Sequence, residues 1–239
     1  MSSLVSFSVR DWSAWAPGLE GRLGFQAWDG QLPQETTVNP KISEFNGMLM
    51  RRASRADKLA LRAALNCAPQ QPIPTVFASR HGEVHRSVEL LEALAKGEAP
   101  SPTSFSLSVH NAAAGFFSLG RADLSASSSV ASGRDTLPMA VIEACGLLSD
   151  GHPQVLLVAY DDAIPRPFAP YLDEPDWALG LALLLEADGP SQLSLELLEG
   201  AVEQERPHLL EFLRFLSAEQ RTELTFRHER RGWRWRRSN

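Results

Sequence analysis

The spacing of apolar and polar residues predicts strands at several points along the chain. Residues 4–9 alternate between the two kinds, which is typical of a strand with one buried face. Residues 101–109 are predicted as a strand or an extended entry, and residues 122–131 as a strand with small side chains. Longer apolar runs indicate strands that helices cover on both faces, at residues 73–79, 154–162 and 177–188.

Other segments repeat their apolar residues with the spacing of a helix that buries one face. Such helices are expected at residues 48–66, 80–96 (after a tight turn), 111–120, 135–151 and 207–220. In the helix predicted at 135–151, Pro138 fits only in the first turn, where backbone N–H groups have no partner within the helix. Asp135 or Thr136 is therefore predicted to be its N-cap.

The remaining segments connect these elements. Residues 12–21 are interpreted as a loop with aromatic anchors, and residues 21–47 as an irregular connection. Residues 191–200 alternate between apolar and polar side chains, and they are predicted to form either a strand or a short helix. Because strands and helices follow one another along the chain, we expect an α/β fold in which helices cover a mixed sheet, with residues 1–239 forming a single domain.

Composition narrows the class of protein. The chain has 239 residues, 44% of them hydrophobic, which is enough for one sizeable core. Its net charge of −6 argues against a general nucleic-acid binder. The two cysteines make no disulfide framework, the start of the chain does not read as a signal peptide, and no run approaches the ~20 apolar residues of a transmembrane segment. We expect a cytoplasmic protein.

Motifs for the common cofactors are not recognised. The glycine-rich loops that bind dinucleotides or phosphates do not occur, and neither does a G-x-S-x-G elbow. His81 and His85 have a helical spacing, but Gly82 between them indicates a turn. Neither a cofactor nor a metal site is therefore predicted.

Residues 126–145, ASSSVASGRDTLPMAVIEAC, have the form of a strand, a turn and a buried helix. Turns of this form often present a nucleophile at the start of a helix. This one offers Ser127, Ser128 and Ser129, with no base visible beside them. Cys145 falls in the middle of the helix and is interpreted as a core thiol.

The segment RHERRGWRWRR, residues 227–237, interleaves basic and aromatic side chains. One interpretation is an edge strand with Trp233 and Trp235 inward and the arginines in water. The other is a surface that binds phosphates or an acidic partner. The strict alternation favours the strand.

Three segments together resemble a known family. They read TVFASRHGEVHRSVELLEALAKGEAPSPTSFSLSVHNAAAGFFSL, SVASGRDTLPMAVIEACGLLSDG and VLLVAYDDAIP. Their order resembles the N-terminal half of β-ketoacyl synthases, which have the thiolase-like fold. SRHGE, SPTSFSLSVHN and the closing WRWRR resemble, more closely, the short synthase-like proteins of aryl-polyene biosynthesis clusters.

The resemblance implies a changed nucleophile. In ketosynthases a cysteine opens the buried helix, and an alignment through the helix puts Arg134 at that position. A competing register puts Ala126 or Val130 there. None of these can be acylated, and an arginine has the wrong charge for a helix N-terminus. The catalytic histidines of full-length synthases lie in a half that this chain does not match, so no catalytic residue is expected.

By the same resemblance, the chain is expected to pair with a full-length ketosynthase as a chain-length factor, to form one wall of its acyl tunnel, and to meet acyl carrier protein only indirectly. The segment SVHNAAAGFFSL resembles the dimer region of such synthases. The candidate residues for facing the tunnel or the partner are Arg80, His81, Glu83, His110, Asn111, Arg134 and Asp135. Arg134 is expected to pair with Asp135 or a partner's acid, or to be solvated. Asn111 is expected to cap the following helix.

Two other functions stay open. A small acyltransferase or degenerate ketosynthase would use a serine nucleophile. A binding module would use the basic tail on nucleic acid or anionic lipid, although the net negative charge argues against this function.

Overall fold

The computed structural model of the protein describes residues 4–28, 38–173, 177–199, 208–228 and 231–238. Its strands are β1 (Val5–Ala16), β2 (Leu19–Glu20), β3 (Thr75–Ala78), β4 (Ser127–Val130), β5 (Val155–Asp161), β6 (Leu179–Glu186), β7 (Gln192–Glu199), β8 (Glu223–His228) and β9 (Arg231–Arg237). Its α-helices are α1 (Gly21–Gln26), α2 (Gly47–Met50), α3 (Arg55–Cys67), α4 (Val84–Ala95), α5 (Pro102–Ser106), α6 (Ala112–Arg121), α7 (Thr136–Ser149) and α8 (His208–Ser217). Two 3-10 turns are η1 (Gly133–Asp135) and η2 (Arg166–Tyr171).

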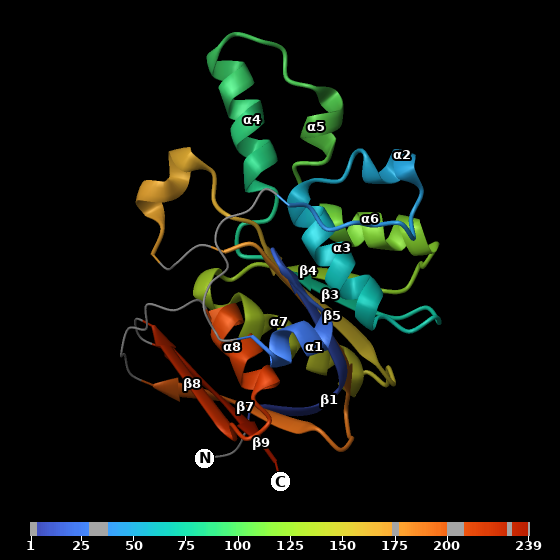
Figure 1. The fold of residues 1–239 in the computed structure, drawn as a ribbon, viewed down its shortest axis with the longest axis vertical. Coiled ribbons are helices and arrows are strands. Elements are labelled where there is room, and N and C mark those ends of the chain that lie inside the picture. The colour runs from blue at the N-terminus through green and yellow to red at the C-terminus, as the bar shows by residue number, and fades with distance from the viewer. Residues whose placement is uncertain (1–3, 29–37, 174–176, 200–207, 229–230, 239) are drawn as a thin grey trace.

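The strands lie in one sheet, in the order β4-β3-β5-β6-β1-β7-β9-β8, and β2 pairs with β1 (Figure 1). β3 is parallel to both β4 and β5, whereas the pairs that link β5, β6, β1, β7, β9 and β8 are antiparallel. The sheet is therefore mixed, as the sequence predicts.

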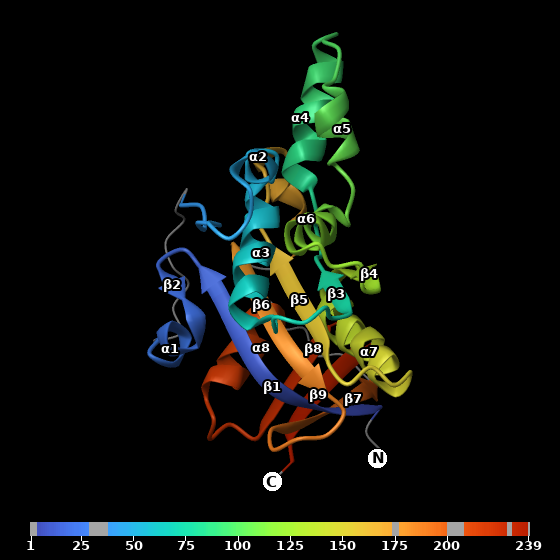
Figure 2. The same ribbon diagram turned by 90° about the vertical axis from the view of Figure 1, so that its right-hand side faces the viewer.

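Helices cover both faces of the sheet because successive side chains of a strand point to opposite sides. On one face, α7 and α8 pack against a core that includes Leu157 and Leu183. On the other, α3 and α6 pack against a core that includes Leu156 and Ala182. Figure 2 shows the sheet between these layers, with α4 and α5 projecting beyond it. The predicted class, an α/β fold with a helix-covered sheet, is confirmed.

The helix predicted at residues 48–66 is wrong as a single element, because it is broken into α2 and α3. Ser54 starts α3 with a capping box, in which its Oγ accepts from the N–H of Asp57 at 3.0 Å. The Asp57 carboxylate in turn accepts from the N–H of Ser54 at 2.8 Å. The S-x-x-D spacing in the sequence is the signal for this break.

Two further predictions are corrected by local geometry. Residues 101–109 contain the helix α5 rather than a strand, because Ser101 caps it and Pro102 occupies its first turn. The predicted loop at residues 12–21 is strand as far as Ala16, since β1 continues along β6. The tryptophans of this part, Trp12 and Trp15, are buried.

The tail forms a strand as predicted, but it is not an edge. β9 lies between β7 and β8, so β8 forms that edge of the sheet. Trp233 and Trp235 are buried in the core, as predicted. Arg234 and Arg236 pair with Glu196, and the Arg236 side chain is also 45% exposed. The strand predicted at 122–131 is shorter, the ambiguous segment at 191–200 contains β7, and part of the connection predicted at 21–47 is helical in α1 and α2. Residues 29–37 of that connection lie outside the described residues.

Among the described helices, none is both long enough and apolar enough to cross a membrane.

Candidate functional site

A cavity of about 70 Å³ lies where β3 and β5 end and α7 begins. In α/β sheets, ligands tend to bind at the carboxyl ends of parallel strands, which makes this cavity the candidate site. Side chains from β3, β5, α7, α8 and the segment around β6 line its largely apolar wall. The apolar residues of this wall are Ala78, Leu137, Ala159, Leu172, Trp177, Leu179, Leu209 and Leu210.

Arg80 and Arg134 form the cationic side of the cavity, and both bind Asp173. Nη2 of Arg80 lies 2.7 Å from each carboxylate oxygen of Asp173. Nε of Arg134 lies 3.2 Å from Oδ2, and its Nη2 also donates to the Asp173 carbonyl. Burial raises the pKa of Asp173, but the hydrogen bond and charge of Arg80 and the charge of Arg134 outweigh it, so this pKa is lowered.

This geometry corrects two expectations for Arg134. Its side chain is 8% exposed, so Arg134 is not a solvated residue. The acid that it binds in the described structure is Asp173, not the neighbouring Asp135. The turn before α7 is thus tied to the segment that follows η2.

The turn after β3 is built on a buried carboxylate. Asp161 accepts from Ser79 Oγ at 2.7 Å and from the backbone N–H groups of Arg80 at 3.2 Å and His81 at 3.0 Å. Burial raises the pKa of Asp161 to about 6, although these hydrogen bonds oppose the rise. Burial, and then the charge of Arg80, lower the pKa of His81 to about 4, so this ring is neutral at pH 7.

His110 bonds to the same turn after β3. Its Nε2 donates to the carbonyl of Ser79 at 2.8 Å, which assigns the proton to that nitrogen. Gly82 has a φ of +53°, and a Cβ there would lie 2.9 Å from the His110 ring. The charged residues of SRHGE are therefore held by a turn that needs both its glycine and this histidine.

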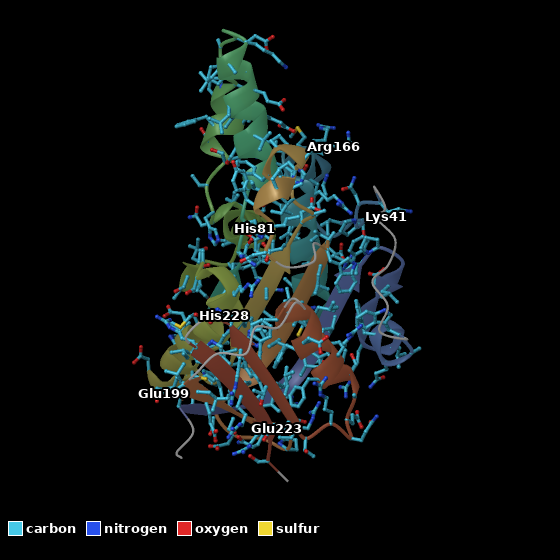
Figure 3. All side chains as sticks on the ribbon, turned by 90° about the vertical axis from the view of Figure 1, so that its left-hand side faces the viewer. Lys41, His81, Arg166, Glu199, Glu223 and His228 are labelled. Carbon is cyan, nitrogen blue, oxygen red and sulfur yellow. The ribbon has the colours of Figure 1, made fainter. Side chains whose placement is uncertain are left out.

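Asp135 is buried at the start of α7, with its carboxylate turned toward the C-terminal strands. It accepts from Nε2 of His228 and from the indole N–H of Trp233, each at 2.6 Å, and from Arg231 at 3.4 Å. Figure 3 shows His228 below His81 on the same side of the molecule. Asp135 occupies the N-cap position of α7, as predicted, although its side chain makes no cap hydrogen bond.

Two other candidates lie away from the cavity. Glu83 is buried, where it accepts from Ser54 Oγ at the start of α3 at 2.6 Å and from Arg86 on α4 at 2.9 Å. Asn111 is exposed at the N-cap position of α6, as predicted, although its side chain makes no cap hydrogen bond. Of the candidate residues, the structure brings Arg80, His81 and Arg134 together at the cavity.

The start of α7 presents no thiol. Of the three positions weighed for the cysteine, only Arg134 lies in the turn that leads into α7. Val130 ends β4, and Ala126 precedes that strand. Cys145 is buried inside α7, and burial raises the pKa of its thiol to about 11, which disfavours the reactive thiolate.

Two of the three serines of β4 have side-chain partners in the described structure. Ser128 Oγ donates to Glu143 at 2.8 Å, and Ser127 Oγ accepts from Thr75 at 2.8 Å. In the described part of the chain, no histidine bonds to these serines, so the base that a serine nucleophile needs is not in place. The same residues contain no group of three or more side chains that would hold a metal ion.

Trp177 and His208 are cavity residues that the sequence did not single out. His208 begins α8, is 3% exposed, and stacks on Phe226 with ring centroids 4.2 Å apart. Its Nε2 accepts from the indole N–H of Trp235 at 2.8 Å. The inward tryptophans of WRWRR were a signal for this packing, but nothing local indicates that α8 reaches the ends of β3 and β5.

Comparison with known protein families gives one match over most of the chain. The family described as β-ketoacyl synthase, N-terminal domain, matches residues 25–236. A search of the curated proteins finds no match.

Several solved structures are similar. In the complex of a ketosynthase (ApeO) with its chain length factor (ApeC) from Xenorhabdus doucetiae, a chain is 31% identical with a TM-score of 0.85, and the match covers 98% of this chain and 100% of that chain. A chain of the ishigamide ketosynthase/chain length factor is 18% identical with a TM-score of 0.63, covering 82% of this chain and 67% of that one. A chain from a type II polyketide synthase ketosynthase in complex with its acyl-carrier protein is 12% identical with a TM-score of 0.67, covering 99% of each. The last two share the fold.

Proposed function

This chain belongs to the family of β-ketoacyl synthase N-terminal domains, and from that premise we propose that it is a non-catalytic, ketosynthase-like subunit. It acts as a chain-length factor, pairing with an active ketosynthase and forming part of the wall of its acyl tunnel. The observation that carries the proposal is the start of α7. Arg134 occupies the turn there, is bound to Asp173, and cannot be acylated.

Similarity to a complex of a ketosynthase with its chain length factor supports this role. The sequence resemblance points to aryl polyenes as the product class. In this proposal residues 1–239 act as one domain in the cytoplasm, and the assembled pair, rather than this chain alone, meets the acyl carrier protein. Arg80, His81 and Arg134 face the tunnel wall.

The partner is proposed to bind at the β4 edge of the sheet. Within the described residues β4 pairs only with β3, so its other edge carries unpaired backbone groups. Figure 2 shows β4 at one side of the molecule, between α6 and α7. Large apolar side chains are exposed on α6 and on the segment between α6 and β4, where Leu119 is 71% and Leu124 is 96% exposed. Exposed apolar residues beside a free strand edge are typical of a protein interface.

Co-expression with the full-length ketosynthase tests the proposal. The expected result is a stable complex of the two chains, and no elongation of acyl-carrier substrates by this chain alone. Mass spectrometry after exposure to acyl thioesters is expected to show no adduct on residues 127–129 or Cys145. Robust condensation by the isolated chain, or failure of the two chains to associate, would contradict the proposal.

The other two functions are not favoured. The serines lack a base, as described above. Two cations of the basic tail are paired within the protein, since Arg234 and Arg236 each pair with both Glu196 and Glu223. A strand whose cations are bound in this way has little charge left for nucleic acid or lipid.

A further inference from the structure

A second pocket, of about 300 Å³, lies where β1, the β6–β7 hairpin, α1, α8 and the end of β9 meet. It shares no lining residue with the candidate site at the start of α7. Three arginines line it, Arg10, Arg22 and Arg237, and among its described lining residues Glu219 is the one acid. Positive charges therefore outnumber negative ones by three to one in this arginine pocket.

Arg237 is a half-buried cation that pairs with no carboxylate in the described part of the chain. Its Nε donates to the carbonyl of Arg221 at 3.1 Å, and its Nη2 donates to the carbonyls of Phe215 at 2.8 Å and Leu216 at 3.2 Å. These bonds fix the guanidinium at the last turn of α8, and none of them uses Nη1. Because a charge taken out of water is costly until it is paired, an anion at this point would be stabilising.

The other two arginines have only weak ion pairs. Nη2 of Arg22 lies 3.3 Å from Oε1 of Glu219, a side chain that is 70% exposed. Nε of Arg10 lies 3.9 Å from Oε1 of Glu186, and the Arg10 side chain is 62% exposed. Exposed pairs of this kind contribute little to stability. Both guanidinium groups can therefore exchange these contacts for a stronger acceptor.

Local structure brings Arg10 and Arg22 to the pocket. The register of β1 against β6 shifts between Val9 and Asp11, so Arg10 is the extra residue of a β-bulge. Bulges re-aim side chains and are frequent beside functional sites. Arg22, on α1, lies over the ring of Trp12, with its guanidinium carbon 5.8 Å from the ring centroid. Figure 1 shows α1 beside α8, the helix that holds Arg237.

The charges of Arg22 and Arg237 act on one another. Burial lowers the pKa of Arg237, against the charge of Glu219, and the charge of Arg22 lowers it further. An anion with several oxygens relieves this repulsion, since each oxygen can accept from a different guanidinium. A water molecule needs about 10–15 Å³ by the same measure of volume, so about 300 Å³ has room for such an anion with an organic group attached.

We propose that the arginine pocket binds a phosphate group, whose oxygens accept from Arg22 and Arg237, with Arg10 as a third donor. A phosphate carries close to two negative charges and three strong acceptor oxygens at pH 7, which matches three guanidinium groups. Inorganic phosphate, a soluble phosphate ester and a phospholipid headgroup share this chemistry. The site is complete within one chain and goes beyond the proposed pairing with a ketosynthase, so the two can fail independently.

The test is a calorimetric titration of the full chain with inorganic phosphate, glycerol 3-phosphate and acetate, at constant ionic strength. Saturable binding of a phosphate probe is expected, and acetate should not bind. Flotation with phosphatidylglycerol vesicles, against phosphatidylcholine vesicles, tests the lipid source. Binding to these anionic vesicles without binding of the soluble probes assigns the phosphate to a lipid. No saturable binding of any phosphate, or equal binding of acetate, would overturn the inference.

Variants of opposite effect separate a binding site from a folding defect. Arg22→Gln removes a guanidinium from a side chain that is 46% exposed, and should weaken phosphate binding by about tenfold. Glu219→Gln removes the competing carboxylate and should strengthen binding by about threefold, a gain that a damaged fold does not give. Arg51→Gln makes the same change of charge at an exposed arginine outside the pocket, and should bind phosphate as the wild type does. Binding that is insensitive to both Arg22→Gln and Glu219→Gln would contradict the assignment.

Discussion

At the residue scale, Asp135 is the side chain that joins the start of α7 to the C-terminal strands. Asp135→Ala would leave the buried indole N–H of Trp233 and the ring of His228 without their acceptor. We expect the free energy of unfolding to fall by about 2–4 kcal/mol, measured by urea denaturation. Asp135→Asn keeps one oxygen acceptor and should lose less. Equal losses in the two variants would show that these hydrogen bonds are not the cause.

Asp57 gives the stability of the protein a dependence on pH. Burial, and next the charge of Glu83, raise its pKa to about 7, against the opposing effects of Ser54 and Arg86. An aspartate in the unfolded chain has a pKa of about 3.9. At pH values between these two pKa values, Asp57 is therefore protonated in the folded state and ionised in the unfolded state. The stabilisation from this proton is complete below pH ~4 and disappears as the pH rises through ~7.

Asp57→Asn tests this dependence, because the amide keeps an oxygen for the N–H of Ser54 but does not titrate. As the pH rises from 5 to 8, we expect the free energy of unfolding of the variant to increase, relative to that of the wild type, by on the order of 1–3 kcal/mol. Urea denaturation at both values measures the gain. His208 has the opposite effect, since its lowered pKa costs stability as the pH falls below ~6.5. Because both proteins contain His208, the difference isolates Asp57. A difference that stays constant with pH would contradict the assignment.

At the scale of elements, the contact of α3 with β6 depends on a glycine. A Cβ on Gly180 would lie 2.3 Å from the carbonyl oxygen of Leu59 and 2.8 Å from its carbonyl carbon. Gly180→Ala must push the helix away from the sheet, and we expect a loss of about 1–3 kcal/mol in the free energy of unfolding. The matched control is Gly146→Ala on α7, where a Cβ meets nothing within 4 Å. That variant should be neutral or more stable by up to about 1 kcal/mol.

The elements that could be predicted from the sequence are those in which burial determines the pattern of apolar and polar residues. β5 and β6 lie between two helical layers, so their residues are apolar throughout and stand out in the sequence. The helix α5 and the break before α3 depend instead on single capping residues, Ser101 and Ser54, which a search for periodicity overlooks. The strand β8 was missed altogether, since its polar positions resemble those of a loop.

The candidate site shows the same division between local and long-range information. The turn before α7 could be predicted from the local strand–turn–helix pattern, and the resemblance to ketosynthases made Arg134 one of three candidates for the position of their cysteine. The partner of Arg134, Asp173, is 39 residues away, and nothing in the sequence pairs the two. Trp177 and His208 join the cavity only through the packing of α8 and β6 on the sheet. Pairings of this kind arise from tertiary structure, which composition and periodicity do not encode.

At the scale of the whole molecule, the sheet runs continuously from β8 to β4, and among the described strands none pairs with the outer edge of β4. The N–H of Thr75 donates to the carbonyl of Ala126, and the N–H of Ser79 donates to that of Val130. Even-numbered residues of this strand therefore bond to β3. The backbone groups of Ser127 and Ser129 point to the free edge, where a partner's strand would add to the sheet.

Ser129→Pro tests whether this edge carries the subunit contact. Proline removes the outward N–H of residue 129 and leaves the bonds between β3 and β4 intact, a placement that edge strands tolerate. We expect the isolated variant to fold with a thermal midpoint near that of the wild type. Its recovery with a co-expressed ketosynthase should fall by about tenfold or more, because the partner strand loses a ladder bond and meets the proline ring.

Ser129→Ala is the matched control, since it changes the same side chain but keeps the N–H, and it should co-purify as the wild type does. Circular dichroism of the isolated variants distinguishes a lost contact from a lost fold. If Ser129→Pro is folded and still recovers the ketosynthase fully, the partner binds elsewhere. The exposed residues Leu119 and Phe105 would then be the next surface to alter, because they lie on helices rather than on the strand edge.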